Sequence, residues 1–234
     1  MLIYGHRGAM TDVPPNTVEA YELAIGQGAD GVELDVRRTR DDAIVIFHDD
    51  RSAPEATPFV DLDLSEIRAT MPSVPTLDEA WAALGPSGLL NIEIKNIYGQ
   101  ADYDPAQRVA AGVVRWIAEH DTGDRVLVSS FNTQALDMVQ ALDPAIRTGL
   151  LSMSWLDPMV AIQQARDGGH VSANLSLIRT LDGAEQIVQA AGDLDIFVWT
   201  VNDPAHALAL ADAGVAGIFT DNPGLMVDAL SGRE

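Results

Sequence analysis

Cysteine is absent from the 234 residues of the chain. Its absence excludes disulfide bonds, thiolate metal sites and a cysteine nucleophile. Long hydrophobic runs are also missing, and no stretch approaches the roughly 20 apolar residues of a membrane span. The first residues lack the basic segment and apolar core of a secretory signal peptide. We therefore expect a cytoplasmic protein with no stable membrane association.

Positive charge is scarce. The chain has 14 Lys and Arg residues against 35 Asp and Glu residues, which gives a formal net charge of −21 at pH 7. A surface of this sign repels nucleic-acid backbones, so we expect no nucleic-acid partner. Lys95 is the single lysine of the chain. Because an ammonium is a compact point charge and a guanidinium is a planar fork, its retention favours a site that needs the ammonium. Chance retention is the alternative.

Apolar residues are plentiful, at 47% of the chain. They fall into eight short strand-like runs, at Leu2–Gly5, Gly31–Val36, Leu89–Lys95, Val126–Ser130, Arg147–Leu151, Val171–Leu175, Ile196–Val201 and Gly217–Asp221. Helical patterns separate the runs, at Thr17–Gln27, Pro105–Glu119, Thr133–Leu142, Pro158–Asp167, Leu181–Ala191, Pro204–Ala213 and Pro223–Leu230. This alternation predicts parallel βα units in an α/β fold. Eight units predict one (β/α)8 TIM-type barrel domain over residues 1–234, and a doubly wound open sheet is the alternative.

One segment departs from this rhythm. Ala43–Phe47 is a ninth strand-like run, and we place it as a short hairpin insertion after the second strand, within residues 41–74. Residues 49–73 are rich in Pro, Asp and Thr and predict an irregular excursion. Thr76 and Glu79 then form a capping-box pattern, which predicts the start of the next helix.

Three acidic residues lie on the second and third barrel strands. Glu33 and Asp35 alternate with Val32, Leu34 and Val36, and Glu93 alternates with apolar residues in the same way. Side chains alternate across a strand. The apolar residues therefore face the surrounding helices, and the three carboxylates and Lys95 face the barrel mouth. Unpaired buried charges are costly, and a bound cation relieves that cost. Oxygen ligands favour one hard divalent cation, Mg²⁺ or Ca²⁺. The alternative is a salt-bridge network with Arg7 or Arg37.

Two histidines follow strand-like runs near these carboxylates. His6 ends the first strand, and His48 follows the hairpin arm. Because histidine titrates near neutral pH, such a pair can supply one neutral base and one protonated acid. The other histidines, His120, His170 and His206, lie near helix ends or in loops, and we expect them at the surface.

Several motifs occur together in one order along the chain, at Gly5-His6-Arg7-Gly8, Pro15-Asn16-Thr17, Gly28–Val36, His48-Asp49, Glu93-Ile94-Lys95, Ser129–Asn132, Trp199–Asn202 and Thr220–Pro223. This ordered set resembles the glycerophosphodiester phosphodiesterase family. The resemblance implies a barrel that hydrolyses glycerophosphodiesters to glycerol 3-phosphate and an alcohol. It also implies that the three carboxylates hold the metal, that His6 and His48 are the acid–base pair, and that Arg7 and Lys95 bind the phosphate of a small anionic substrate.

The chain departs from the family pattern in two places. Pro15 stands where the family usually has glutamate, and Asp50–Pro54 replaces the usual Arg-Thr-Thr pattern. Phe131, Trp155 and Trp199 are candidates for an apolar rim beside the phosphate, while Phe131 and Trp199 equally fit the barrel interior. The preferred alcohol and the oligomeric state stay open.

Other readings of the function also remain. A lysophospholipase D or sphingomyelinase D-like phosphodiesterase would carry an apolar groove beside the phosphate site. A non-catalytic barrel that binds phosphodiesters would be expected to lack one of the five catalytic or metal-binding residues, and all five are present. An unrelated metallohydrolase is disfavoured because the chain has no closely spaced pair of histidine ligands.

Overall fold

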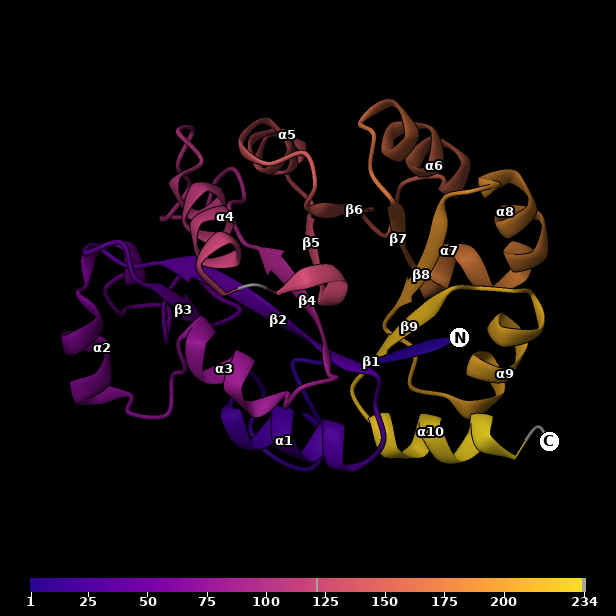
Figure 1. The fold of residues 1–234 in the computed structure, drawn as a ribbon, viewed down its shortest axis with the longest axis horizontal. Helices are drawn as coiled ribbons and strands as arrows, with labels where there is room; N and C mark the ends of the chain where they lie inside the picture. The colour runs from indigo at the N-terminus through magenta and orange to yellow at the C-terminus, as the bar shows by residue number, and fades with distance from the viewer. Residues whose placement is uncertain (121, 233–234) are drawn as a thin grey trace.

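Eight parallel strands close into a barrel in the computed structural model, which describes residues 1–120 and 122–232 (Figure 1). The strands follow the order β1-β9-β8-β7-β6-β5-β4-β2, and pairing of β1 with β2 closes the ring. They are β1 Leu2–His6, β2 Gly31–Arg38, β4 Leu89–Ile94, β5 Val126–Ser130, β6 Arg147–Leu151, β7 Ser172–Ser176, β8 Asp195–Trp199 and β9 Gly217–Thr220. The (β/α)8 prediction is confirmed, and the doubly wound alternative is wrong. The extent of the domain, residues 1–234, stays a prediction.

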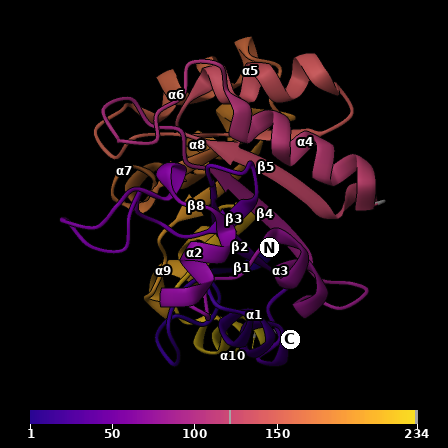
Figure 2. The same cartoon turned by 90° about the vertical axis from the view of Figure 1, so that its left-hand side faces the viewer.

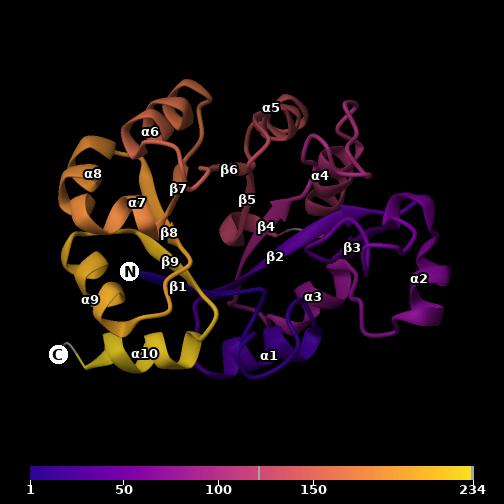
Figure 3. The ribbon, with the colours of Figure 1, turned by 180° about the vertical axis from the view of Figure 1, so that it is seen from behind.

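Helices surround the strands on the outside of the barrel (Figure 3). They are α1 Val18–Gly26, α3 Leu77–Ala83, α4 Arg108–His120, α5 Thr133–Leu142, α6 Pro158–Asp167, α8 Ala184–Ala191, α9 Pro204–Asp212 and α10 Pro223–Ser231. Thr76 caps α3 in the predicted capping box. Proline in the first turn of α6, α9 and α10 follows a capping Asp or Asn side chain. The missing N–H of proline costs nothing there, because the first helical N–H groups lack intrahelical partners.

The apolar residues form separate layers inside and outside the strands. Val32, Leu34 and Val36 are fully buried in the layer between strands and helices, as alternation predicts. A second cluster, Tyr4, Leu127, Phe197 and Phe219, fills the barrel interior. Tyr4 packs against both phenylalanine rings, with centroids 5.9 and 5.4 Å away. This aromatic layer closes the barrel below its mouth.

The insertion after β2 contains more regular structure than the sequence predicts. β3 Ile44–Ile46 pairs antiparallel with β2, as expected for a hairpin arm. The following excursion is not irregular, because it holds the short 3₁₀ helix η1 Phe59–Asp61 and the helix α2 Leu64–Thr70. A capping box of Asp63 and Glu66 starts α2. A small apolar cluster of Val45, Phe59, Ile67 and Val74 stabilises the insertion. Its α2 and β3 lie at the left of Figure 1 and face the viewer in Figure 2.

Two further details differ from the sequence prediction. The helix expected over Leu181–Ala191 is preceded by α7 Leu177–Thr180, and Leu181–Gly183 forms the 3₁₀ helix η3 before α8 begins. His170 is only 6% exposed, so its prediction as a surface residue is wrong. It is buried because the Thr148 hydroxyl lies 2.9 Å from its Nδ1 and satisfies the ring. His120 and His206 are half-buried. None of the helices within the described ranges is long and apolar enough to cross a membrane.

Candidate active site

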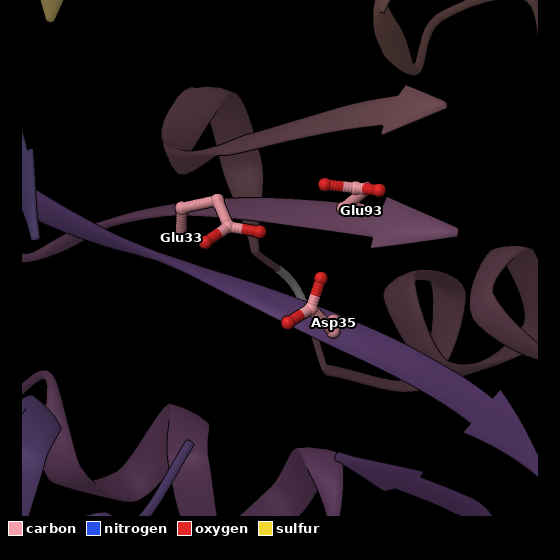
Figure 4. Close-up of side chains that lie close together, drawn as sticks. All are labelled: Glu33, Asp35 and Glu93. Carbon is pink, nitrogen blue, oxygen red and sulfur yellow. The ribbon is translucent and has the colours of Figure 1, made fainter. Parts of the chain in front are cut away.

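Three carboxylates converge at the mouth of the barrel (Figure 4). Glu33 and Asp35 project from β2 on the same side, and Glu93 projects from the neighbouring β4. The parallel register places Asp35 directly beside Glu93. One ligand oxygen from each of the three residues lies within 4.8 Å of the others, and all three residues are buried. The alternation in the sequence therefore leads to one compact acidic cluster.

Two cations and one amide lie against Asp35. Lys95 Nζ is 3.1 Å from its Oδ1 and also pairs with Glu93, while Arg7 Nε is 3.2 Å from its Oδ2. The Asn16 amide donates to Oδ2 over 2.8 Å. Burial alone would raise the pKa of Asp35, but Lys95 and Arg7 outweigh it and lower the pKa to about 2. Burial lowers the pKa of Lys95, and its two carboxylate neighbours outweigh that effect and raise it.

Glu33 has a different environment. Burial and the charge of Asp35 raise the pKa of Glu33 to about 8. Its Oε1 is buried and has no hydrogen-bond partner among the described residues. An unpaired buried carboxylate oxygen is costly unless a cation approaches it. The three residues thus fit a hard divalent cation, which would supply the positive charge that Glu33 lacks. The salt-bridge alternative covers Asp35 and Glu93, but among the described residues Glu33 has no Arg or Lys ion pair, and its only ion-pair partner is His6, whose Nε2 lies 4.0 Å from Oε2.

His6 lies next to this cluster at the end of β1. Its Nε2 is 4.0 Å from Glu33, and its Nδ1 is 2.6 Å from Asp221 Oδ1. The amide of Asn202 in turn donates to Asp221 Oδ2 over 2.6 Å. Burial lowers the pKa of His6, but the hydrogen bond to Asp221 and the charge of Glu33 outweigh burial and raise it. The ring is therefore oriented by a fixed carboxylate.

Sequence reasoning missed Asp221 and Asn16 as site residues. The motif Thr220–Pro223 was noted without a role for Asp221, and in the structure its Asn222 is the cap of α10. A usable signal for Asp221 was its position directly after the last barrel strand, where parallel barrels place functional residues. Asn16 belongs to a motif that was noted without a role. It adopts a positive φ of 56°, is buried, and holds Asp35, whereas Pro15 beside it is exposed.

His48 comes from the insertion. It follows β3, its Nδ1 is 2.7 Å from Asp49 Oδ1, and its side chain is 42% exposed. Burial lowers the pKa of His48, with a smaller opposing contribution from Asp35. Its backbone carbonyl accepts from the fully buried guanidinium of Arg37. Arg37 also pairs with Asp102, so it does not serve as the partner of Glu33 or Asp35 that the salt-bridge reading offered.

Six of the side chains described above border one pocket of about 250 Å³, and Asp35 lies behind them, in contact with Arg7 and Lys95. His6, Arg7, Glu33, His48, Glu93 and Lys95 line its polar side, and Phe131 and Trp199 line the other. The two rings meet edge to face at 5.6 Å, and Lys95 Nζ lies 5.9 Å from the Phe131 centroid. Both rings are half-buried and line the pocket. This favours the prediction that they form an apolar rim beside the phosphate over the alternative that they fill the barrel interior. Trp155 is 70% exposed and is not part of this lining.

Comparisons with known proteins agree with this geometry. Residues 6–225 match the model of the glycerophosphoryl diester phosphodiesterase family. A glycerophosphodiester phosphodiesterase of Caldanaerobacter subterraneus is 30% identical over 97% of this chain and 96% of its own length. An uncharacterized Bacillus subtilis protein is 31% identical over 94% of this chain and 95% of its own length.

Solved structures show the same likeness. The glycerophosphodiester phosphodiesterase of Thermotoga maritima superposes with a TM-score of 0.81 at 25% identity, with 97% of each chain covered. A phosphodiesterase of Oleispira antarctica, solved with the product sn-glycerol-3-phosphate, superposes with a TM-score of 0.85 at 25% identity. The superposition covers 99% of this chain and 97% of that chain. With the family model matched over nearly the whole barrel, the chain belongs to the glycerophosphoryl diester phosphodiesterase family and is a phosphodiester hydrolase.

Proposed function

We propose that the chain hydrolyses small glycerophosphodiesters to glycerol 3-phosphate and an alcohol at the mouth of the barrel. The observation that carries the proposal is a cluster of three carboxylates, two of which line one pocket together with two histidines. The product bound to the Oleispira antarctica relative, sn-glycerol-3-phosphate, supports the substrate class.

The carboxylate cluster is the proposed metal site. Glu33, Asp35 and Glu93 would hold one divalent cation, Mg²⁺ or Ca²⁺, which when bound supplies charge neutralisation to the phosphoryl oxygens. Arg7 and Lys95 border the same space and would bind the phosphate monoanion. Both are tied to Asp35, so their charges are already oriented before substrate arrives. Such preorganised charge stabilises the oxygens as negative charge develops on them.

The two histidines are the proposed acid–base pair. One accepts the proton of the glycerol 2-hydroxyl as its oxygen attacks phosphorus, and the other gives a proton to the departing alcohol. The products of this step are a cyclic phosphate and the free alcohol. Water then opens the ring with the two roles exchanged, which returns both histidines to their starting states. Each proton transfer of this kind contributes about 10²–10⁴ in rate.

The test is an assay of the purified full chain on glycerophosphocholine, glycerophosphoethanolamine and glycerophosphoglycerol. Mg²⁺ and Ca²⁺ are compared after chelation and dialysis. We expect turnover of at least one diester, its loss after chelation, and its recovery with one of the two ions. Full turnover in metal-free buffer would contradict the metal site, and failure on all three diesters with either ion would contradict the activity.

A further inference from the structure

Two polar side chains interrupt the apolar filling of the barrel below the carboxylates. Asn91 stands on β4 two residues before Glu93, on the same face of the strand. Ser129 stands on the neighbouring β5, and the Asn91 amide Nδ2 donates to its Oγ over 2.9 Å. Both residues are buried, with 1% and 0% of their surface exposed. Because an apolar pair of similar size would fill this space without the cost of burying polar groups, the polar pair indicates a function.

The Asn91 amide is only partly satisfied. Its Nδ2 is occupied by Ser129, whereas its Oδ1 is buried and has no hydrogen-bond partner among the described residues. Asn91 also lines the catalytic pocket. A buried carbonyl oxygen without a donor costs stability, and a donor that enters through the pocket would remove that cost. Asn91 therefore has the character of a ligand-binding residue.

Asn91 lies deeper in the barrel than the groups assigned to the phosphate. It precedes Glu93 by two residues and Lys95 by four. Since a strand rises about 3.3 Å per residue, Asn91 is roughly 7 Å below Glu93. Its register partner on β2 is Glu33, one step below the pair of Asp35 and Glu93. The aromatic layer closes the barrel further down, so only a small group fits at this depth.

The glycerol side of the substrate is the side that matches this depth. With the phosphate at Arg7 and Lys95, the glycerol 2-hydroxyl has to stay close to phosphorus in order to attack it. The terminal hydroxyl is one carbon further from phosphorus and reaches deeper into the pocket. In-line displacement places the leaving alcohol on the far side of phosphorus from the attacking oxygen. The head group of the alcohol then lies toward the open mouth, where its size is less restricted.

We propose that Asn91 binds the terminal hydroxyl of the substrate glycerol at the bottom of the pocket. This inference rests on the proposed function and adds a specificity-determining residue to it. The hydroxyl donates to Asn91 Oδ1, while Ser129 holds the other end of the amide. A hydroxyl both donates and accepts, so it would pair with the amide in either of its two orientations. Asn91 makes and breaks no bond, and it selects substrates that carry this hydroxyl.

The experiment uses a pair of substrates with the same head group. One is the glycerophosphodiester that the natural chain turns over best among the three assayed above, and the other is its 2-hydroxypropyl analogue. The analogue keeps the attacking 2-hydroxyl and lacks only the terminal one. The measured quantity is the ratio of kcat/KM for the glycerol diester over the analogue. We expect a ratio of about 10–100 for the natural chain, because the analogue leaves a buried polar group unpaired.

Asn91→Leu should bring that ratio close to one, since the apolar side chain no longer distinguishes the two substrates. Should this variant fail to fold, Asn91→Leu combined with Ser129→Ala removes both polar groups and should give the same ratio. The matched control is Asn174→Leu. Asn174 is a fully buried asparagine on β7 whose Nδ2 also lacks a partner among the described residues, but it does not line the pocket. Its replacement should leave the ratio unchanged.

Three results would overturn the assignment of Asn91. A natural ratio near one would do so, and so would a natural ratio retained by Asn91→Leu, because a merely structural residue lowers turnover of both substrates alike. The third concerns the concentration of Mg²⁺ or Ca²⁺ at half-maximal turnover. If Asn91→Leu raises it for both substrates at an unchanged ratio, the residue serves the ion rather than the hydroxyl. In all three cases turnover of the glycerol diester still upholds the proposed function, whereas no turnover of any of the three diesters contradicts both.

Discussion

His6 and His48 reach the same pocket from two different kinds of structure. His6 sits on a barrel strand, and its ring is held by Asp221, whose side chain is only 23% exposed. His48 sits on the insertion beside Asp49, which is 70% exposed, and its backbone is held by buried Arg37. The barrel thus orients one histidine through its side chain, while the insertion positions the other through its main chain. Five substitutions and one control variant test this comparison.

The largest effects should come from the histidines themselves. His6→Ala and His48→Ala should each lower kcat by about 10²–10⁴, because each removes one of the two proton transfers. Thermal unfolding should stay close to that of the natural chain, since both rings border the pocket rather than the core. Steady-state kinetics on a glycerophosphodiester, together with circular dichroism, measures both quantities. Natural turnover in either variant would remove that histidine from the mechanism.

The anchor of His48 should have the next largest effect. Arg37→Met should lower the free energy of unfolding by about 3–5 kcal/mol, because it leaves the buried Asp102 carboxylate without its cation. It should also lower kcat, since the His48 carbonyl loses its donor. Urea denaturation and turnover are the measurements. Arg40→Met is the matched control. Arg40 follows β2 and also pairs with the insertion, at Asp63 and Glu66, but it is 51% exposed, so both quantities should stay near natural. A stable, fully active Arg37→Met variant would show that the insertion positions His48 without this anchor.

Replacing the carboxylate partners of the two histidines should lower kcat to different extents. Asp221→Asn should lower kcat roughly tenfold, because the His6 ring loses a charged acceptor in a half-buried position. Asp49→Asn should change kcat little, because exposed pairs are weakened by solvent. The ratio of the two kcat values is the informative quantity, with KM recorded for each. Equal losses would mean that both histidines depend on their side-chain partner alike.

The smallest effect concerns a histidine away from the mouth. Burial lowers the pKa of His170 below 6.5. Just below pH 6.5 the His170 ring is therefore protonated more in the unfolded chain than in the folded chain. Stability therefore falls as the pH drops from 6.5 toward the folded pKa, with a slope of at most about 1.4 kcal/mol per pH unit from this residue. His170→Asn should remove that share of the slope. Urea denaturation at several pH values measures it, and parallel curves for the two proteins would contradict the assignment.

The sequence predicted the parts of the fold that follow from local patterns. Eight apolar runs with helices between them are sufficient for a βα barrel, and the helices predicted to start at Pro204 and Pro223 do start there, after the caps Asp203 and Asn222. It did not predict α2, because the Pro, Asp and Thr residues of 49–73 indicated an irregular excursion, and the capping box of Asp63 and Glu66 within it was not recognised. The burial of His170 also escaped prediction, because its partner Thr148 is distant in sequence.

In the candidate site, too, some features follow from the sequence alone and others depend on the tertiary structure. Alternation along one strand determines by itself that Glu33 and Asp35 share a face, because successive side chains point to opposite sides of the backbone. Which strands become neighbours, and in what register, is a property of the closed barrel. Only the tertiary structure therefore decided that Asp35 lies beside Glu93 and that Asp221 meets His6 across 215 residues.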